Sequence, residues 1–191
     1  MTTSTLERPN AVTTSSAGNV APETLYRARQ LLRTEIDFIP NPEFRCEGLY
    51  DTGFVDATLA ELEASSNGPA DLPSHLRRMC DSELLSQEQE TALFREMNYL
   101  KFRANALRSR INLENVDSRS IEAIDRLLLR SQTIRDRILQ ANTRLVMSIV
   151  KKFVTPQQSF DDMLSDGIYT LMQAVEKFDY DRGFRFSTYA Y

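Results

Sequence analysis

The chain has 191 residues and a formal net charge of −4, which gives enough length for one domain with tails or for two small domains. Two cysteines without a CxxC pattern and a single histidine argue against a disulfide framework or a zinc site, and they favour a reducing cytoplasm. The apolar runs are too short to span a bilayer, and the N-terminus lacks the apolar segment of a secretory signal. We therefore predict a cytoplasmic protein with no membrane partner.

Charge is distributed unevenly along the chain. Residues 1–73 carry five basic and eleven acidic side chains, whereas residues 118–152 carry eight basic and three acidic ones. Residues 159–181 then carry six acidic side chains against Lys177 alone. A protein with one basic and one acidic face can bind two partners of opposite charge, although solvated helix faces would give the same pattern.

The N-terminal part is predicted to contain a disordered tail and an acidic extension. Residues 1–21 are rich in Ser, Thr and Ala and show no hydrophobic period, which is typical of disorder. Residues 22–73 form an acidic, partly helical extension, with one helix that begins at Pro22 and another over residues 55–64. The turn-forming residues 65–73 predict a linker and a domain boundary.

Residues 74–191 are predicted to form one helical domain. Ser86 and Gln89 match a capping box at the start of a long helix. Ser118 begins the next helix, which either continues past Ser131 or restarts there. Strand-like alternation of useful length does not occur in the sequence. The predicted fold class is therefore all-α.

The last predicted elements are an acidic helix and an aromatic segment. Ser159 is expected to cap the acidic helix, which has two aspartates in its first turn. Gly167 would allow a neighbouring helix to approach closely. Residues 181–183 form a turn, and Ser187 is expected to cap a final short helix.

Residue constellations typical of enzymes are missing from the sequence. No glycine-rich phosphate loop occurs, and His75 has no evident base, nucleophile or metal ligand near it. A partly buried or capping position is the expected role of His75. We predict a non-enzymatic protein without catalytic residues, metal or cofactor.

The segment 178–191 contains six of the seventeen aromatic residues in the chain, interleaved with arginines and hydroxyl side chains. Such a composition suits single-stranded nucleic acid, because bases stack on aromatic rings while arginines and hydroxyls contact phosphates. The alternative is that the rings complete a small hydrophobic core. We expect a mixture, with Phe178 in the core and at least Phe186 and Tyr189 facing outward.

Two stretches carry a family resemblance. ANTRLVMSIVKKF (residues 141–153) and FDDMLSDGIYTLMQAVEKFDYDRGFRFSTYA (residues 160–190) resemble region 2 of RNA polymerase sigma factors of the bacterial sigma-70 family. Residues 75–97 resemble region 1.2 of that family more loosely. The resemblance implies a compact multi-helix domain of the region 2 type. It also implies a transcription initiation factor that binds core RNA polymerase and recognises and melts the promoter −10 element.

The resemblance also implies two sets of site residues. The first set would bind the clamp helices of the polymerase β′ subunit and consists of Asp161, Asp162, Ser165, Asp166 and Met172. The second set would bind promoter DNA, in particular the single-stranded non-template −10 element, and consists of Arg182, Phe184, Arg185, Phe186, Thr188, Tyr189, Asn142, Arg144 and Arg77. Within it, Tyr189 would stack on the flipped adenine.

The C-terminal end departs from the family pattern. Tyr191 stands where the family usually has a small residue, and the Trp-Trp wedge and the −35-reading domain do not follow. Either the chain is a piece cut from a longer protein or it is a naturally truncated one, and the stop within a capped helix favours a cut. The alternative function is a helical module that binds core polymerase or an anti-sigma factor without melting DNA.

Overall fold

The structure is a computed structural model that describes residues 21–46, 52–64, 84–155 and 158–191. The helices within these ranges are α1 (Pro22–Arg33), α2 (Thr52–Ala64), α4 (Gln87–Arg108), α5 (Ser118–Val150), α6 (Phe160–Lys177) and α7 (Phe186–Ala190), with two 3₁₀ helices, η1 (Pro42–Arg45) and η2 (Tyr180–Arg182). The only extended pairing among the described residues is an isolated bridge between Thr155 and Gln158. The all-α prediction is confirmed.

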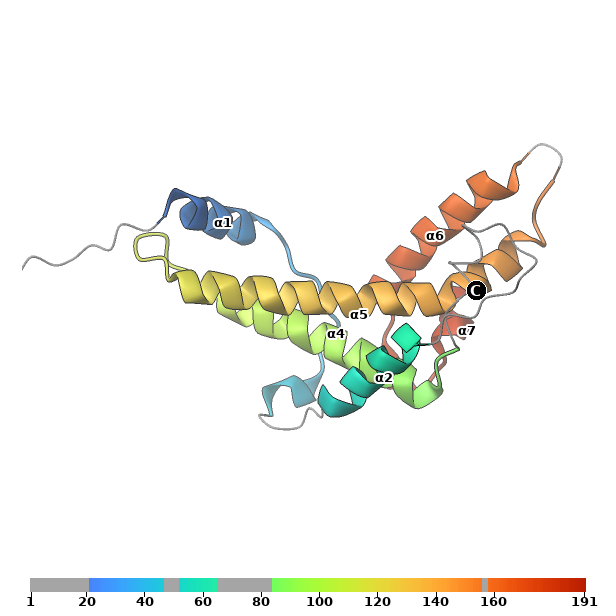
Figure 1. The fold of residues 1–191 in the computed structure, drawn as a ribbon, viewed down its shortest axis with the longest axis horizontal. Helices are drawn as coiled ribbons and strands as arrows, with labels where there is room; N and C mark the ends of the chain where they lie inside the picture. Colours follow the sequence, from blue (N-terminus) through green and yellow to red (C-terminus); the bar gives the residue numbers. More distant parts are fainter. Residues whose placement is uncertain (1–20, 47–51, 65–83, 156–157) are drawn as a thin grey trace, which may run out of the picture.

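A long helical hairpin of α4 and α5 forms the centre of the molecule (Figure 1). The expected capping box begins α4, since Ser86 Oγ accepts from the backbone N of Gln89 while the Gln89 side chain accepts from the backbone N of Ser86. Asp117 caps α5, which continues without interruption past Ser131. Apolar residues of both helices meet in the main core, which also receives the buried side chains of α6.

Helix α6 crosses α5 at a point of close approach and leaves the hairpin at an angle (Figure 1). A Cβ atom placed on Gly167 would lie 2.6 Å from Cγ1 of Val146, which is far below a normal contact distance. The expected role of Gly167 in close helix packing is confirmed. As predicted, Ser159 caps the helix, because its Oγ accepts from the backbone N of Asp162 at 3.1 Å.

The N-terminal residues pack along the hairpin. Helix α1 covers the end of the hairpin near the α4–α5 loop, where Ala28 and Leu31 contribute to a second, smaller core. On its rim, Arg27 forms a salt bridge with Asp125 at 2.6 Å. Residues 34–46, which we call the strap and which include η1, then continue from α1 along α4.

A buried carboxylate ties α2 to the hairpin. Glu96 of α4 accepts from Nε of Arg130 at 2.6 Å, and Arg130 also bonds Asp56 of α2 at 2.9 Å. Burial raises the pKa of Glu96, while its bond to Arg130 opposes that shift. Arg130 belongs to the basic segment of α5, so part of that positive charge is neutralised within the fold.

Several predictions concern residues outside the described ranges. These are most of the expected disordered tail, the linker at residues 65–73, and the roles expected for His75 and Arg77. The expected cap at Ser187 is wrong, because α7 begins one residue earlier, at Phe186, and its start has no side-chain cap. None of the helices in the described ranges combines the length and apolar character needed to cross a membrane.

Candidate functional site

A cluster of buried rings determines which C-terminal aromatic residues reach the solvent. Phe186 is 0% exposed, and its ring centroid lies 5.1 Å from that of Phe94 and 5.2 Å from that of Phe178. The outward orientation expected for Phe186 is therefore wrong, whereas the core position expected for Phe178 is confirmed. The physical reason is that α7 folds back onto α4, whose apolar face accommodates both rings.

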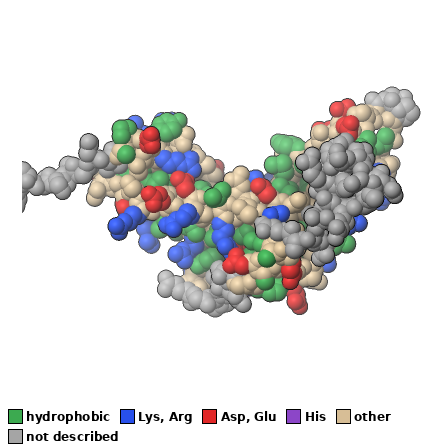
Figure 2. All heavy atoms as spheres, in the orientation of Figure 1, with side chains coloured by type: hydrophobic (Ala, Val, Ile, Leu, Met, Phe, Trp, Pro, Cys, Tyr) green, Lys and Arg blue, Asp and Glu red, His purple; other side chains and the backbone are tan. Residues whose placement is uncertain are grey.

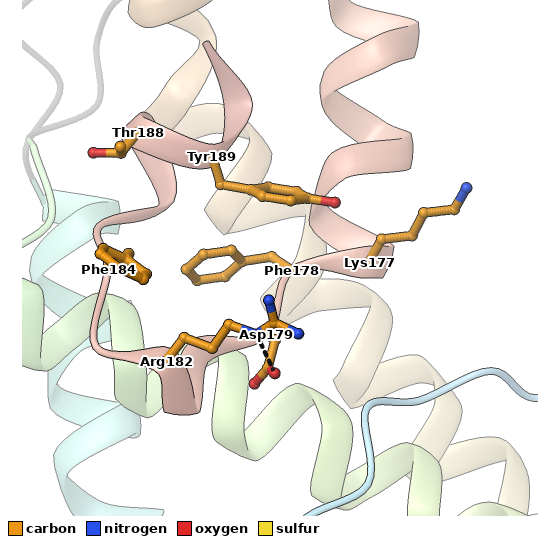
Figure 3. Close-up of a pocket in the computed structure, with 7 residues that line it drawn as sticks. All are labelled: Lys177, Phe178, Asp179, Arg182, Phe184, Thr188 and Tyr189. Atoms are coloured by element: carbon orange, nitrogen blue, oxygen red, sulfur yellow. Dashed lines mark hydrogen bonds and ion pairs between the residues drawn. The ribbon is translucent and has the colours of Figure 1, made fainter.

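The rings that stay exposed line a hollow that we call the aromatic pocket. Its volume is about 470 Å³, and its lining residues are Lys177, Phe178, Asp179, Arg182, Phe184, Thr188 and Tyr189. Phe184 is 66% exposed and Tyr189 is 51% exposed, so the outward orientation expected for Tyr189 is confirmed. Figure 3 shows both rings next to that of Phe178, while Thr188 points away from them. The pocket thus offers two accessible ring systems.

The turn between α6 and α7 places a cation at this pocket. Nε of Arg182 donates to Oδ2 of Asp179 at 2.9 Å, as Figure 3 shows. Gly183 follows with a φ of 74°, a left-handed conformation that glycine adopts without strain, and it turns the chain toward Phe184. Arg182 and Lys177 are the two cations of the pocket, and Asp179 offsets part of their charge.

Arg185 is held by the start of α4. Its Nη2 donates to the carbonyl oxygen of Leu85 at 2.8 Å, and its Nε lies 3.3 Å from Oε1 of Glu90. The same Glu90 oxygen accepts from the backbone N of Phe186 at 2.7 Å. One buried carboxylate therefore fixes both the arginine and the first residue of α7.

A second hollow, the basic pocket, combines residues of α5 with the segment that begins α7. Its volume is about 510 Å³, and its lining residues are Leu84, Leu85, Glu90, Ala141, Asn142, Arg144, Leu145, Arg185 and Ser187. Arg144 is exposed, while Asn142 is half-buried and donates to the carbonyl oxygen of Ile138 at 2.8 Å. The structure thus divides the predicted DNA-binding residues between two pockets that share α7, except for Phe186, which is buried and lines neither pocket, and Arg77, which lies outside the described ranges.

Sequence reasoning did not identify Glu90 as a site residue. Glu90 lies three and four residues before Leu93 and Phe94, so it occupies the apolar face of α4. An acidic residue on a buried helix face needs a hydrogen-bond donor or a cation beside it. The position of Glu90 in the apolar pattern of α4 therefore indicates a structural contact.

We expect Glu90→Ala to lower the free energy of unfolding by about 1–3 kcal/mol, because the backbone N–H of Phe186 would lose its buried acceptor. Chemical denaturation of the 191-residue chain measures this change. Glu88→Ala is the matched control, since it removes an exposed acid from the same helical turn. Equal stability of the two variants would contradict the role of Glu90.

The predicted core-binding residues lie together on the outer face of α6. Asp161, Asp162, Ser165, Asp166 and Met172 are all exposed, and Tyr169 adds a ring that is 64% exposed. Figure 2 shows acidic side chains near the outer end of α6, apart from the Lys and Arg side chains along the hairpin. Asp162 also accepts from Oγ of Ser159 at 2.7 Å, so it belongs to the helix cap. Among the described residues, no group of His, Cys, Asp or Glu side chains is arranged to hold a metal ion.

Comparison with known proteins shows what the C-terminal part of the chain is similar to. Residues 138–191 match the model of sigma-70 region 2. Over 75 residues the chain is 43% identical to RNA polymerase sigma factor SigA1 of Synechococcus elongatus, which covers 39% of this chain and 18% of that protein. The identity is 39% over 84 residues to SigA of Synechocystis sp., covering 42% of this chain and 20% of the relative.

A longer match covers more of the chain. Over 128 residues the chain is 32% identical to RNA polymerase sigma factor SigA2 of Synechococcus elongatus, which covers 62% of this chain and 40% of that protein. The chain thus spans between 18% and 40% of the length of these three relatives. The matched region contains α6, η2 and α7, and with them both sets of predicted site residues apart from Arg77. Residues 138–191 are therefore similar to sigma-70 region 2, and the relatives that the chain matches are RNA polymerase sigma factors.

Proposed function

We propose that this chain is part of a transcription initiation factor that binds core RNA polymerase and recognises and melts the promoter −10 element. The observation that carries the proposal is the position of two different surfaces within the region 2 match. One is the exposed acidic face of α6, and the other is the pair of pockets around α7, most of whose lining residues belong to the match. Binding to the open strand is sufficient for melting, so no hydrolytic chemistry is required.

The acidic face of α6 is the proposed contact with core polymerase, through the clamp helices of its β′ subunit. Three exposed aspartates lie on the N-terminal part of this face, and Tyr169 and Met172 follow them along the helix. Charged and apolar groups on one face are typical of a protein interface, in which apolar contacts supply affinity and charges supply orientation. A basic partner helix could make both the apolar and the charged contacts.

The aromatic pocket is the proposed site for an unpaired base of the non-template strand. Stacking on an aromatic side chain contributes about 1–3 kcal/mol per base, and flipping a base out of a duplex costs a few kcal/mol. Tyr189 and Phe184 can therefore offset much of that cost. Arg182 and Lys177 lie where they can contact the flanking phosphates. In the basic pocket, Arg144 and Asn142 would contact the same strand further along.

The test is Tyr189→Ala in a complex of the full chain with core polymerase. We expect the affinity for a fluorescent single-stranded −10 oligonucleotide to fall by about five- to 150-fold, which corresponds to the loss of one stacking contact. Tyr26→Ala is the matched control, because Tyr26 is 65% exposed and lies on α1, which does not line either pocket. Equal affinity of the Tyr189 variant and the control would reject the stacking role.

A second candidate function is a protein-binding module without melting activity, whose partner is core polymerase or an anti-sigma factor. The burial of Phe186 and the engagement of Arg185 by Glu90 favour it, since both reduce the surface available to DNA. Core polymerase capture without any oligonucleotide binding by the wild-type complex would select this candidate over the first.

A further inference from the structure

The strap connects the N-terminal residues to the turn that carries Arg182. It is fixed on α4 by a hydrogen bond from the backbone N of Ile39 to Oδ1 of Asn98 at 2.7 Å. Beyond this point Phe44 is buried, with its ring centroid 5.8 Å from that of Tyr99 and 5.6 Å from that of Phe102. Asn41 lies between these two anchors, so its position along α4 is set from both sides.

Asn41 joins the strap to η2 by its side-chain amide. Its Nδ2 donates to Oδ2 of Asp181 at 2.6 Å and to Oη of Tyr180 at 3.3 Å. Its Oδ1 accepts from the backbone N of Glu43 at 2.9 Å, which caps η1. The residue is 8% exposed, so these hydrogen bonds are largely shielded from water. The donor side of the amide holds the turn, and the acceptor side holds the strap.

The turn needs such a partner because it concentrates negative charge. Burial raises the pKa of Asp181, Arg95 opposes the shift, and Asp179 and Glu43 add to it as neighbouring negative charges. An amide N–H that points at Asp181 stabilises the carboxylate in this arrangement. Asp179 is paired with Arg182 and Glu43 with Arg95, so without the amide the partly buried Asp181 would lose its own close partner and would be better solvated in a more open turn.

Opening the turn would change the aromatic pocket. Arg182 directly follows Asp181, and Gly183 and Phe184 come next, so any displacement of η2 moves a cation and a ring that line the pocket. We propose that Asn41 is a positioning residue for the aromatic pocket, which it holds in the geometry that accepts an unpaired base. This inference rests on the proposed function of that pocket.

Two substitutions distinguish the hydrogen bond that Asn41 donates to Asp181 from the one that it accepts from Glu43. Asn41→Asp keeps the acceptor that caps η1 but replaces the donor to Asp181 with a fourth negative charge, so the strap keeps its cap while the turn loses its partner. Asn41→Ala removes both sides. Asn115→Asp is the control, because Asn115 is an exposed residue of the α4–α5 loop and adds the same charge far along the chain from the turn.

The first measurement is amide hydrogen exchange at residues 180–184 in the full chain without polymerase. We expect exchange there to be about tenfold or more faster in Asn41→Asp than in wild type and in the control, since a buried hydrogen bond to a charged group is lost. The second measurement is binding of the −10 oligonucleotide by the complex with core polymerase, which should weaken by a similar factor. Capture of core polymerase should not change, because α6 lies outside the contact.

The outcomes are distinguishable. If wild type binds the oligonucleotide and Asn41→Asp binds it equally well, the positioning role is overturned while the proposed function stands. Unchanged exchange at residues 180–184 would likewise overturn the positioning role. If the wild-type complex does not bind the oligonucleotide at all, the proposed function fails, and the positioning role fails with it.

Discussion

Phe186→Ala is expected to lower the free energy of unfolding by about 3–5 kcal/mol, the cost of removing a fully buried phenyl ring. The ring packs against Phe94 and Phe178, whose own centroids lie 4.8 Å apart. Truncation would leave a cavity between α4 and α7 that neither neighbour can fill without moving its helix. The loss should therefore be larger than for any exposed ring of the C-terminal segment.

The matched variant is Phe184→Ala, two residues earlier and 66% exposed. It should leave the unfolding free energy within about 0.5 kcal/mol of wild type, as is usual for surface substitutions. It should nevertheless weaken oligonucleotide binding, because Phe184 lines the aromatic pocket. Denaturation curves of both variants measure the difference. If Phe184→Ala proved as destabilising as Phe186→Ala, the assignment of one ring to the core and the other to the pocket would be wrong.

Reversing the charge of Asp161 and Asp166 together should abolish capture of core polymerase, with an affinity loss of about two orders of magnitude or more. Each Asp→Lys change replaces an attraction to a basic partner with a repulsion of several kcal/mol at most, and tenfold corresponds to about 1.4 kcal/mol. Asp162 is left unchanged, because it accepts from Ser159 in the helix cap and its loss would weaken α6 itself.

Glu114→Lys combined with Glu122→Lys is the control for this experiment. These two exposed acids lie near the α4–α5 loop, and their reversal changes the net charge of the chain by the same amount. Capture by immobilised core polymerase at two salt concentrations measures the effect, since a charge-dependent contact weakens as salt rises. Retention of the α6 variant at the level of the control would exclude this face as the docking surface.

Local signals explain why much of the fold is predictable. A capping box needs residues only three positions apart, so Ser86 and Gln89 predict the start of α4 directly. Ser159 predicts the start of α6 in the same way. The close approach at Gly167 is also predictable, because glycine inside a helix usually has a packing reason. The exposed acids of α6 follow from helical periodicity alone.

Long-range pairs explain what the sequence could not predict. Phe186 was expected to face solvent because its neighbours are polar, yet a buried carboxylate 96 residues earlier binds its backbone and draws the ring inward. The contact between Asn41 and Asp181 joins residues 140 positions apart. The position of Glu90 on an apolar helix face indicates that it needs a partner, but no local pattern says which residue that partner is, so only the packed structure identifies what Glu90 and Asn41 bind.

Because Gly167 has no side chain, it determines how closely α6 packs on α5, and with it the position of both proposed contacts on α6. It allows α6 to rest on α5 at Val146, and a larger residue would push the whole helix outward. Asp166 lies beside this contact, and Lys177, which ends α6, lines the aromatic pocket. Within α6, eleven residues separate Asp166 of the proposed polymerase contact from Lys177 of the aromatic pocket, a span of about 16 Å, and Met172 of the same contact lies between them. In the proposed function, α6 therefore fixes the distance between the polymerase contact and the site where the DNA strand is opened.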